Sequence, residues 1–244
     1  MRRQIKYKEN NMHKENCVAC GAELVYLPEP MEMECIYCHK SFKSQVQCQN
    51  EHYVCDSCHS KNGIEFILQV CNMTKETDPY KIAELLFRDE RIHMHGPEHH
   101  VLVPAVLLAS YYNKIGQSEE GLKAKALEMA KERGQHVPGG FCGFAGSCGA
   151  GIGVGIFYAI MENTSPLDSR KWGNVNQATG NALLNIGQYN GPRCCKRNTF
   201  LAFETVIEML KEEKGVDLID GKHRCKWSPL NNECLKEKCQ FYGK

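Results

Sequence analysis

The stretch from Phe141 to Met161, FCGFAGSCGAGIGVGIFYAIM, carries no charged residue over 21 positions. It is long enough to cross a bilayer. However, it holds six glycines and two cysteines and follows Pro138-Gly139-Gly140, whereas membrane spans favour continuous Leu, Ile and Val. We therefore expect a buried helix preceded by a glycine-rich loop, and not a membrane span.

Apolar residues at helical spacing occur on both sides of this stretch, and turn residues mark the ends of these segments. Pro104 falls in the first turn of a hydrophobic segment, where proline is tolerated. Gly134 and Gly215 are expected to end two helices, and Asn198 or Thr199 to cap the second of these. Helices are predicted from about 63, from 78, over 101–115 and 118–133, through about 158–161 after the glycine-rich loop, over 168–186, and from 198 or 199 to 214. No segment outside the N-terminal part alternates like a strand, so the main domain is predicted to be a mostly α helical bundle.

The cysteines divide the chain into blocks, at 17–71, 142–195 and 225–239. The first block is dense in Cys, His and turn residues and has no long apolar period, so it cannot build an ordinary core. We expect four segments: a flexible tail over 1–16, a zinc-binding module over 17–62, an α-helical iron–sulfur domain over 63–215, and a cysteine-containing tail over 216–244.

Cysteine accounts for 15 of the 244 residues, and the net charge is +1. This charge gives no global field that would attract nucleic acid or an anionic membrane. The first 16 residues, MRRQIKYKENNMHKEN, lack the apolar segment of a secretory signal. An odd cysteine count without an export signal argues against a disulfide framework. We expect a reduced, cytoplasmic protein whose thiolates hold metal, a load that is easiest to keep reduced in an anaerobe.

Two sets of potential zinc ligands lie in the N-terminal module. Paired Cys-x2-Cys knuckles are typical of structural zinc sites. The sets are Cys17, Cys20, Cys35 and Cys38, and then Cys48, His52, Cys55 and Cys58. They predict two zinc ions, with ligands that pair sequentially, as in a zinc ribbon, or interleave as in cross-braced RING-like modules; we favour sequential pairing. Cys71 is expected to pack in a helix, although it could replace His52.

The module is expected to serve as a scaffold or docking platform. Tyr37, Phe42 and Tyr53 could stack on bases, but they suit a small core equally well. The basic residues nearby are few. Nucleic-acid binding is therefore a weaker interpretation.

Three motifs of the main domain suggest chemistry: HMHGPEHH over 93–100, PGGFCGFAGSCGAG over 138–151, and GPRCCKRN over 191–198. Helix N-termini and neighbouring cations favour thiolates. Dispersed cysteines in glycine-rich or helix-start settings suit an iron–sulfur cluster better than a zinc knuckle, and a cluster with three cysteine ligands leaves one iron open as a Lewis acid. The expected cluster ligands are Cys142, Cys148, Cys194 and Cys195.

Polar residues of the same motifs supply candidate catalytic groups. Glu98, His99 or His100 would act as general base, since histidine titrates near neutral pH. A substrate carboxylate would be held by a cation of the third motif, from Arg193, Lys196 and Arg197.

Cys225, Cys234 and Cys239 close the chain, and His223 precedes them. These groups could bind another metal ion or cap the cluster domain, and free thiols are the alternative. Trp227 and Phe241-Tyr242 are expected to anchor this tail on the main domain.

From about Cys17 to the C-terminus the chain resembles a family of uncharacterised, cysteine-rich proteins from anaerobic bacteria and archaea. The strings HGPEHH, VPGGFCGFAGSCGAGIGVGI and GPRCCKR carry this resemblance. The family has no assigned activity.

The order of motifs from about 93 to 212 is also similar to that of the iron–sulfur-dependent serine dehydratase α-domain and of L-cysteine desulfidases. This resemblance implies an all-α bundle with a [4Fe–4S] cluster, and β-elimination of water or sulfide from a small amino acid. Cys142 or Cys148 would match the middle ligand, and Cys194 or Cys195 the last. Arg197-Asn198 resembles the closing Arg-Asn pair of the dehydratases.

Taken together, we expect a cluster-dependent lyase or sulfur-handling enzyme that acts on a small amino-acid-like molecule. The alternative is a non-catalytic zinc and iron–sulfur protein that docks on a partner enzyme or supplies it with metal or sulfur.

Overall fold

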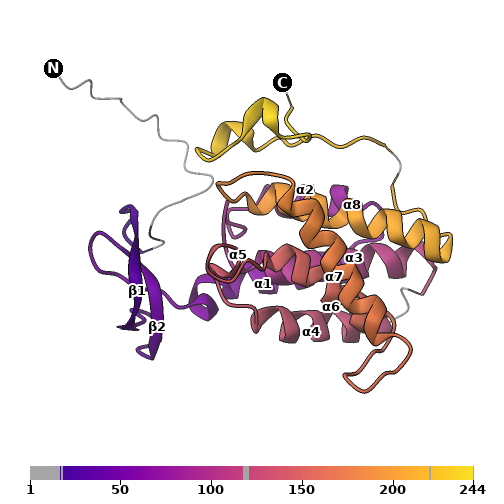
Figure 1. Ribbon diagram of the computed structural model, residues 1–244, viewed down its shortest axis with the longest axis horizontal. Coiled ribbons are helices and arrows are strands. Elements are labelled where there is room, and N and C mark those ends of the chain that lie inside the picture. Colours follow the sequence, from indigo (N-terminus) through magenta and orange to yellow (C-terminus); the bar gives the residue numbers. More distant parts are fainter. Residues whose placement is uncertain (1–16, 18, 118–120, 220, 244) are drawn as a thin grey trace.

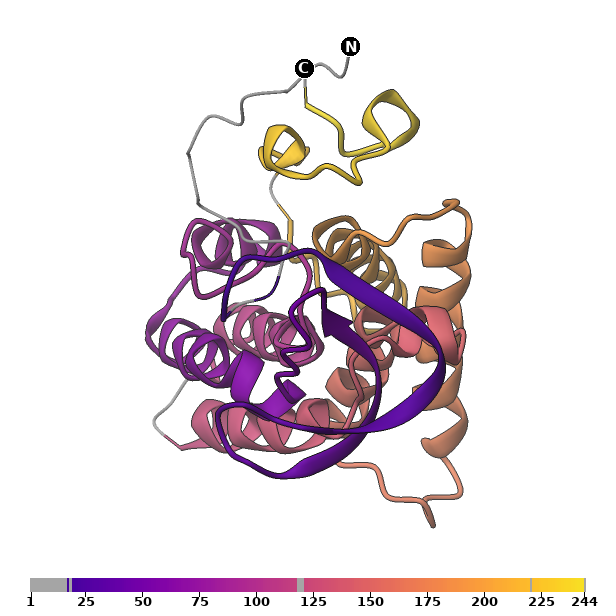
Figure 2. The ribbon, with the colours of Figure 1, turned by 90° about the vertical axis from the view of Figure 1, so that its left-hand side faces the viewer.

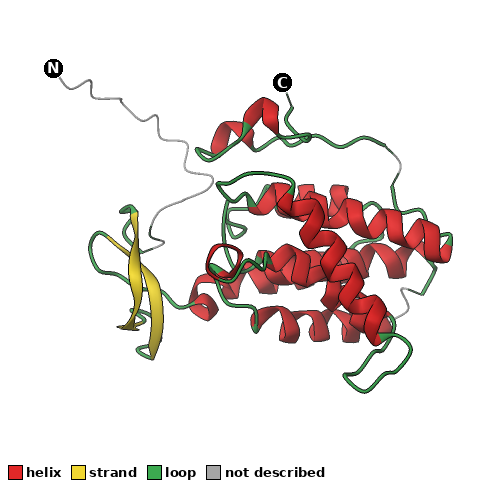
Figure 3. Ribbon diagram, viewed as in Figure 1, coloured by secondary structure: helices red, strands yellow, loops and turns green. Residues whose placement is uncertain are grey.

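The computed structural model describes residues 17, 19–117, 121–219 and 221–243. A two-stranded hairpin stands at one end of a helical bundle, and the C-terminal segment runs along another side of the bundle (Figure 1). The helices of the described residues are α1 (Asp56–Met73), α2 (Pro79–Leu86), α3 (His99–Lys114), α4 (Leu122–Gln135), α5 (Phe141–Phe144), α6 (Gly149–Met161), α7 (Trp172–Gly187) and α8 (Cys195–Lys214). The prediction of a mostly α helical bundle is confirmed (Figure 3).

The hairpin consists of the antiparallel strands β1 (Leu24–Glu34) and β2 (Ser41–Cys48), paired from Leu24 with Cys48 to Glu34 with Ser41. An irregularity interrupts the register between Tyr26 and Met31. Most of its side chains are exposed or half-buried. An isolated two-stranded hairpin is marginally stable in water, so this one requires support from outside its own strands.

Helix α1 begins within the predicted module, directly after Cys55, and continues through the predicted boundary at residue 62. Its buried face includes Ile64, Ile67 and Cys71. The packing of Cys71 in a helix is thus confirmed. Since one helix carries both the end of the module and the start of the bundle core, the two parts share a rigid element.

Helices α3 and α6 form the centre of the bundle, and both are buried over most of their length. The glycines of α6 permit this packing. A Cβ atom on Gly153 would lie 3.0 Å from atoms of Val103 and Pro104 in α3, and one on Gly155 would lie 2.1 Å from Oγ1 of Thr179 in α7. The prediction of a buried helix is therefore confirmed for 149–161. In the part of the chain that is described, no helix has the length and apolar character needed to cross a membrane.

Several helix ends differ from the predictions. Helix α3 begins at His99, so Pro104 lies beyond the first turn. Helix α4 continues past Gly134 to Gln135, and its predicted cap at 118–120 lies outside the described residues. Helix α8 begins at Cys195 instead of 198 or 199, because Cys194 is the N-cap and its sulfur accepts a hydrogen bond from the Arg197 N–H. The predicted start of a helix at 78 is confirmed, with Asp78 as the N-cap of α2, and so is the predicted end of α8 at Gly215.

The C-terminal segment folds back on the bundle and contains two short 3-10 helices, at Ser228–Leu230 and Lys236–Lys238. Figure 2 shows it above the bundle, while the hairpin lies in front of the bundle. Trp227 donates its indole N–H to the carbonyl oxygen of Phe87 at 2.9 Å. Phe241 packs edge-on against Phe200. These contacts confirm the predicted anchoring by Trp227 and Phe241.

Candidate functional site

Two groups of four potential ligands lie in the N-terminal module, and each is close enough to hold one metal ion such as zinc. The Sγ atoms of Cys20 and Cys48 are 3.8 Å apart, and so are those of Cys38 and Cys55. Metal–sulfur bonds of about 2.3 Å in a tetrahedron place sulfurs about 3.8 Å apart. The groups are Cys17, Cys20, Cys48 and His52, and Cys35, Cys38, Cys55 and Cys58.

The favoured sequential pairing is wrong, because the groups interleave in a cross-brace. The physical reason is the length of β1. Cys20 precedes this eleven-residue strand and Cys35 follows it, and a strand advances about 3.3 Å per residue. The first two knuckles therefore stand at opposite ends of the hairpin. Cys48 instead pairs with Leu24, next to the first knuckle.

Backbone N–H groups lower the pKa of one thiol at each end of the hairpin. Donation from the Ala22 N–H lowers the pKa of Cys20 to about 6. Burial opposes ionisation of Cys35, but donation from backbone N–H groups, chiefly that of Cys55, outweighs it and lowers the pKa to about 6. Each group thus contains a thiol that ionises readily, as a metal ligand must.

In the main domain, three of the four predicted cluster cysteines line two different spaces. Cys142 and Cys148 line a cleft of about 540 Å³. Cys194 lines a separate, narrow hollow. The backbone N–H of Cys195 points to Nδ1 of His95, 3.5 Å away.

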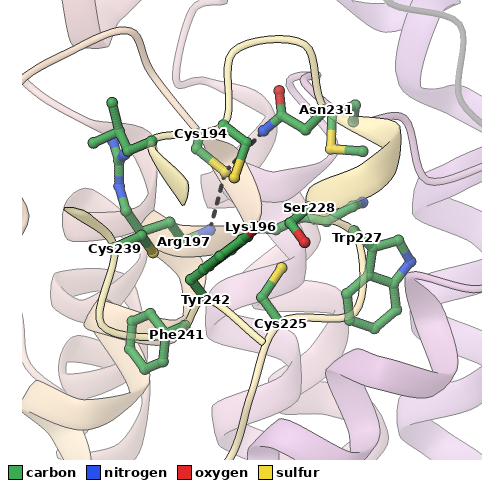
Figure 4. Close-up of a pocket in the computed structure, with 13 residues that line it drawn as sticks. Cys194, Lys196, Arg197, Cys225, Trp227, Ser228, Asn231, Cys239, Phe241 and Tyr242 are labelled. Atoms are coloured by element: carbon green, nitrogen blue, oxygen red, sulfur yellow. Dashed lines mark hydrogen bonds between the residues drawn. The ribbon is translucent and has the colours of Figure 1, made fainter. Parts of the chain in front are cut away.

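The hollow brings Cys194 together with the three C-terminal cysteines, Cys225, Cys234 and Cys239 (Figure 4). Its free volume is about 20 Å³, enough for a water-sized body. In the described chain, no three of these sulfurs all lie within 4.8 Å of one another. They are thus spaced more widely than the thiols of the module.

Hydrogen bonds point at the sulfurs of this hollow. Asn231 Nδ2 and the Arg197 N–H each donate to Cys194 Sγ at 3.4 Å, and the Lys236 N–H donates to Cys234 Sγ at 3.3 Å. Burial raises the pKa of Cys194, and that of Cys225 to about 11. Such thiols stay protonated unless a cation replaces the proton. The donor set therefore suits a thiophilic metal or an iron–sulfur cluster.

His223 does not join these cysteines. Its ring stacks on Tyr80 with centroids 4.3 Å apart, and its Nε2 lies 2.8 Å from Oδ2 of Asp78. The sequence did not suggest the set that does form, because the spacing of the C-terminal cysteines resembles no recognised motif. Only the fold-back of the tail brings them to Cys194.

The cleft combines thiols with cationic groups. Arg193 and Arg197 line it beside Cys142 and Cys148. Arg197 also lines the hollow, so this residue borders both spaces. Asn198 Nδ2 donates to Cys148 Sγ at 3.3 Å.

Residues from distant segments of the chain also line the cleft. Arg193 Nη1 donates to the Tyr26 hydroxyl of β1 at 3.0 Å. Glu233 of the C-terminal segment lines the cleft, and its Oε2 lies 3.1 Å from Nε2 of His95. Burial lowers the pKa of His95 to about 3, so the imidazole is neutral. Glu233 is thus a carboxylate in the cleft that the sequence analysis missed.

The predicted bases lie elsewhere. Glu98 is fully buried and accepts a hydrogen bond from the His93 N–H at 2.9 Å. His99 Nε2 donates to the His93 carbonyl oxygen, and His100 Nδ1 to that of Val137. The described lining of the cleft includes none of these three predicted bases.

Lys196 is buried completely and lines the hollow. Its ammonium lies 4.3 Å from the ring centroid of Phe87 and donates to the His93 carbonyl oxygen at 3.4 Å. Burial lowers its pKa to about 8. Of the predicted carboxylate-binding cations, Arg193 and Arg197 reach the cleft and Lys196 faces the hollow instead.

Comparison with known proteins identifies the family of the chain but no activity. No curated protein and no solved structure matches the chain. Residues 67–242 match DUF5714, a family of unknown function, and leave the paired metal-ligand groups of the module outside the match. The expected membership of an uncharacterised family is therefore confirmed, and the chain belongs to DUF5714.

Proposed function

We propose that this protein is an iron–sulfur-dependent lyase or sulfur-handling enzyme that acts on a small amino-acid-like substrate, with two structural zinc ions in its N-terminal module. One observation carries the proposal: Arg197 borders both the four-cysteine hollow and the open cleft. A metal centre and a substrate site with a cation for a carboxylate are thus adjacent.

The module sites suit structural zinc, since each offers four Cys or His ligands and leaves no position open. Two such ions would hold both ends of a hairpin that has little core of its own. In the hollow, Cys194, Cys225, Cys234 and Cys239 would hold a [4Fe–4S] cluster, whose chemistry when bound is electron transfer, since four cysteine ligands leave no iron open. Because the free volume is about 20 Å³, the C-terminal segment that carries three of these cysteines would have to move outwards to admit the cluster.

In the cleft, the cationic and anionic residues would have different roles. Arg193 and Arg197 would bind the carboxylate of the substrate through charge-assisted hydrogen bonds. Glu233 would accept a proton from the bound molecule, in the role first expected of Glu98. The thiols of Cys142 and Cys148 would contact the end of the substrate that carries its sulfur or hydroxyl group.

Anaerobic iron and sulfide analysis tests the metal assignment. Loaded protein should contain about four iron and four sulfide. Serine at any one of the four ligand positions should remove most of the visible absorption, whereas the control Cys71→Ala should keep it. One iron or zinc without sulfide would assign the narrow hollow to a single ion and overturn the cluster. Loss of absorption only at Cys142 and Cys148 would move the cluster to the cleft.

Turnover tests the reaction class. The loaded protein is assayed for sulfide or ammonia release from L-cysteine and L-serine. Arg193→Gln should raise KM about tenfold or more, since a charge-assisted hydrogen bond contributes about 1.5–3 kcal/mol. A fully loaded protein that converts neither amino acid nor their close analogues refutes the lyase.

A non-catalytic docking role is the second candidate, and exposed apolar side chains on the module favour it. They lie on or beside the hairpin: Val25, Tyr26, Met31, Tyr37 and Phe42. A partner enzyme seated there could receive metal or sulfur. This candidate predicts that Met31→Glu leaves the metal content intact and weakens binding to an enzyme that accepts iron or sulfur from the protein. Unchanged transfer would count against it.

A further inference from the structure

We propose that His59, His93 and Glu98 bind a third divalent metal ion, at the junction between the N-terminal module and the bundle. Each residue offers one ligand atom, and these atoms all lie within 4.8 Å of one another. The proposal is independent of the enzymatic function and adds to the two ions of the module.

Two elements supply the ligands. His59 lies in the first turn of α1, directly after the module ligand Cys58. His93 and Glu98 lie in the segment between α2 and α3. An ion at this point would tie the helix that leaves the module to the segment that leads into the central helix of the bundle.

The donor spacing suits a small cation. His93 Nδ1 lies 3.2 Å from Glu98 Oε1, and the rings of His59 and His93 have centroids 4.4 Å apart at 50°. Metal–nitrogen and metal–oxygen bonds of about 2.0–2.2 Å in a tetrahedron place donors about 3.3–3.6 Å apart. Two imidazoles and a carboxylate suit Zn²⁺ or Fe²⁺, whereas Ca²⁺ and Mg²⁺ take oxygen ligands.

Unsatisfied buried atoms distinguish a metal site from a simple ion pair. A hydrogen bond between His93 and Glu98 uses only Oε1 of the carboxylate. Within the described residues, Oε2 of Glu98 and Nδ1 of His59 are buried and have no hydrogen-bond partner. Leaving buried polar atoms unpaired is costly. A cation coordinated by both residues would remove that cost.

The surrounding chain is shaped to admit the carboxylate. A Cβ atom on Gly96 would lie 2.1 Å from Oε2 of Glu98, so only glycine fits there without displacing the side chain. His99 Nε2 and Lys196 Nζ both donate to the carbonyl oxygen of His93, at 3.1 and 3.4 Å. Such outer contacts fix the orientation of a ligand segment.

Metal analysis of the full chain, loaded with Zn²⁺ alone and freed of loosely bound metal, tests the proposal. His93→Asn and Glu98→Gln should each contain one zinc ion fewer than the unmodified protein. The matched control His136→Asn should lose none, since the ring of His136 is outside the cluster and its Nδ1 donates to the Glu132 carbonyl oxygen. Far-ultraviolet circular dichroism checks that each variant is folded. Equal zinc content in all four proteins overturns the third site.

Cobalt substitution gives a second, spectroscopic readout, which starts from the unmodified protein. The module offers seven thiolates and one imidazole, while the third site offers only nitrogen and oxygen. Co²⁺ titrated into the unmodified protein should therefore show, besides thiolate-to-cobalt charge-transfer bands, a visible component without charge transfer. This component should be absent from Glu98→Gln. A spectrum of thiolate-bound cobalt alone would contradict the proposal.

Discussion

The side-chain amide of Asn231 donates a hydrogen bond to Sγ of Cys194, 3.4 Å away. The same side chain accepts one from the Glu233 N–H at 2.9 Å. Asn231 thus joins the C-terminal segment to the start of α8 and orients the loop that carries Glu233 into the cleft.

Replacing Asn231 by Asp tests this link. The substitution keeps the acceptor for the Glu233 N–H but replaces the amide that donates to the Cys194 sulfur with a carboxylate oxygen, which cannot donate. We expect a loss of about 1–3 kcal/mol in the free energy of unfolding, measured by urea titration, and weaker metal retention in the hollow. The control is Ser228→Ala at the same hollow. If both variants behave alike, the Asn231 contact contributes nothing specific.

Trp227 tests the anchoring of the C-terminal segment. It is buried against Phe87, with ring centroids 5.2 Å apart, and donates to the Phe87 carbonyl oxygen. Trp227→Ala should lower the free energy of unfolding by about 3–5 kcal/mol. Trp227→Phe loses mainly the hydrogen bond and should lower it by about 1–2 kcal/mol. Equal values for the two variants would show that ring packing is irrelevant.

The bundle was predictable because its signals are local, whereas the sites depend on contacts between distant segments. Asp78-Pro79 and Gly215 mark helix ends by their own backbone preferences, and the structure follows them. The start of α8 was missed because a cysteine, Cys194, fills the cap position that Asn or Thr usually takes. Cys194 meets the C-terminal cysteines only because the C-terminal segment folds back on the bundle, and no periodicity in the sequence indicates that fold-back.

Replacing glycine by alanine should have opposite effects on stability at two positions in the bundle, Gly134 and Gly180. A Cβ atom on buried Gly134 would lie 2.9 Å from the His100 carbonyl oxygen and 3.0 Å from Cα of Val101. Because backbone atoms cannot move aside cheaply, Gly134→Ala should destabilise the protein by about 1–3 kcal/mol. Gly180 in α7 has open space, and Gly180→Ala should stabilise by about 0.5–1 kcal/mol. Thermal unfolding of the pair measures both signs, and the same sign for both contradicts the packing.

Cys71 predicts a dependence of stability on pH. Burial raises the pKa of its thiol to about 12, while the unfolded thiol titrates near 8.5. The folded chain therefore keeps this proton where the unfolded chain loses it. The contribution is fully present below about pH 8.5 and declines as pH rises towards 12. Cys71→Val should flatten the decline. In native protein at pH 8, iodoacetamide should leave Cys71 unlabelled until denaturant is added, and rapid native labelling would refute its burial.

Zinc counting in double variants distinguishes the cross-brace from sequential pairing. Cys20 and Cys48 belong to one group and Cys35 to the other. Each single Cys→Ala variant should lose one zinc ion, because removal of one ligand from a closed tetrahedral site sharply weakens binding. Cys20→Ala with Cys48→Ala should still lose only one ion, since both changes fall in the same site. Cys20→Ala with Cys35→Ala should lose two. Sequential pairing predicts the reverse for the two double variants, so zinc content per folded chain decides between the arrangements.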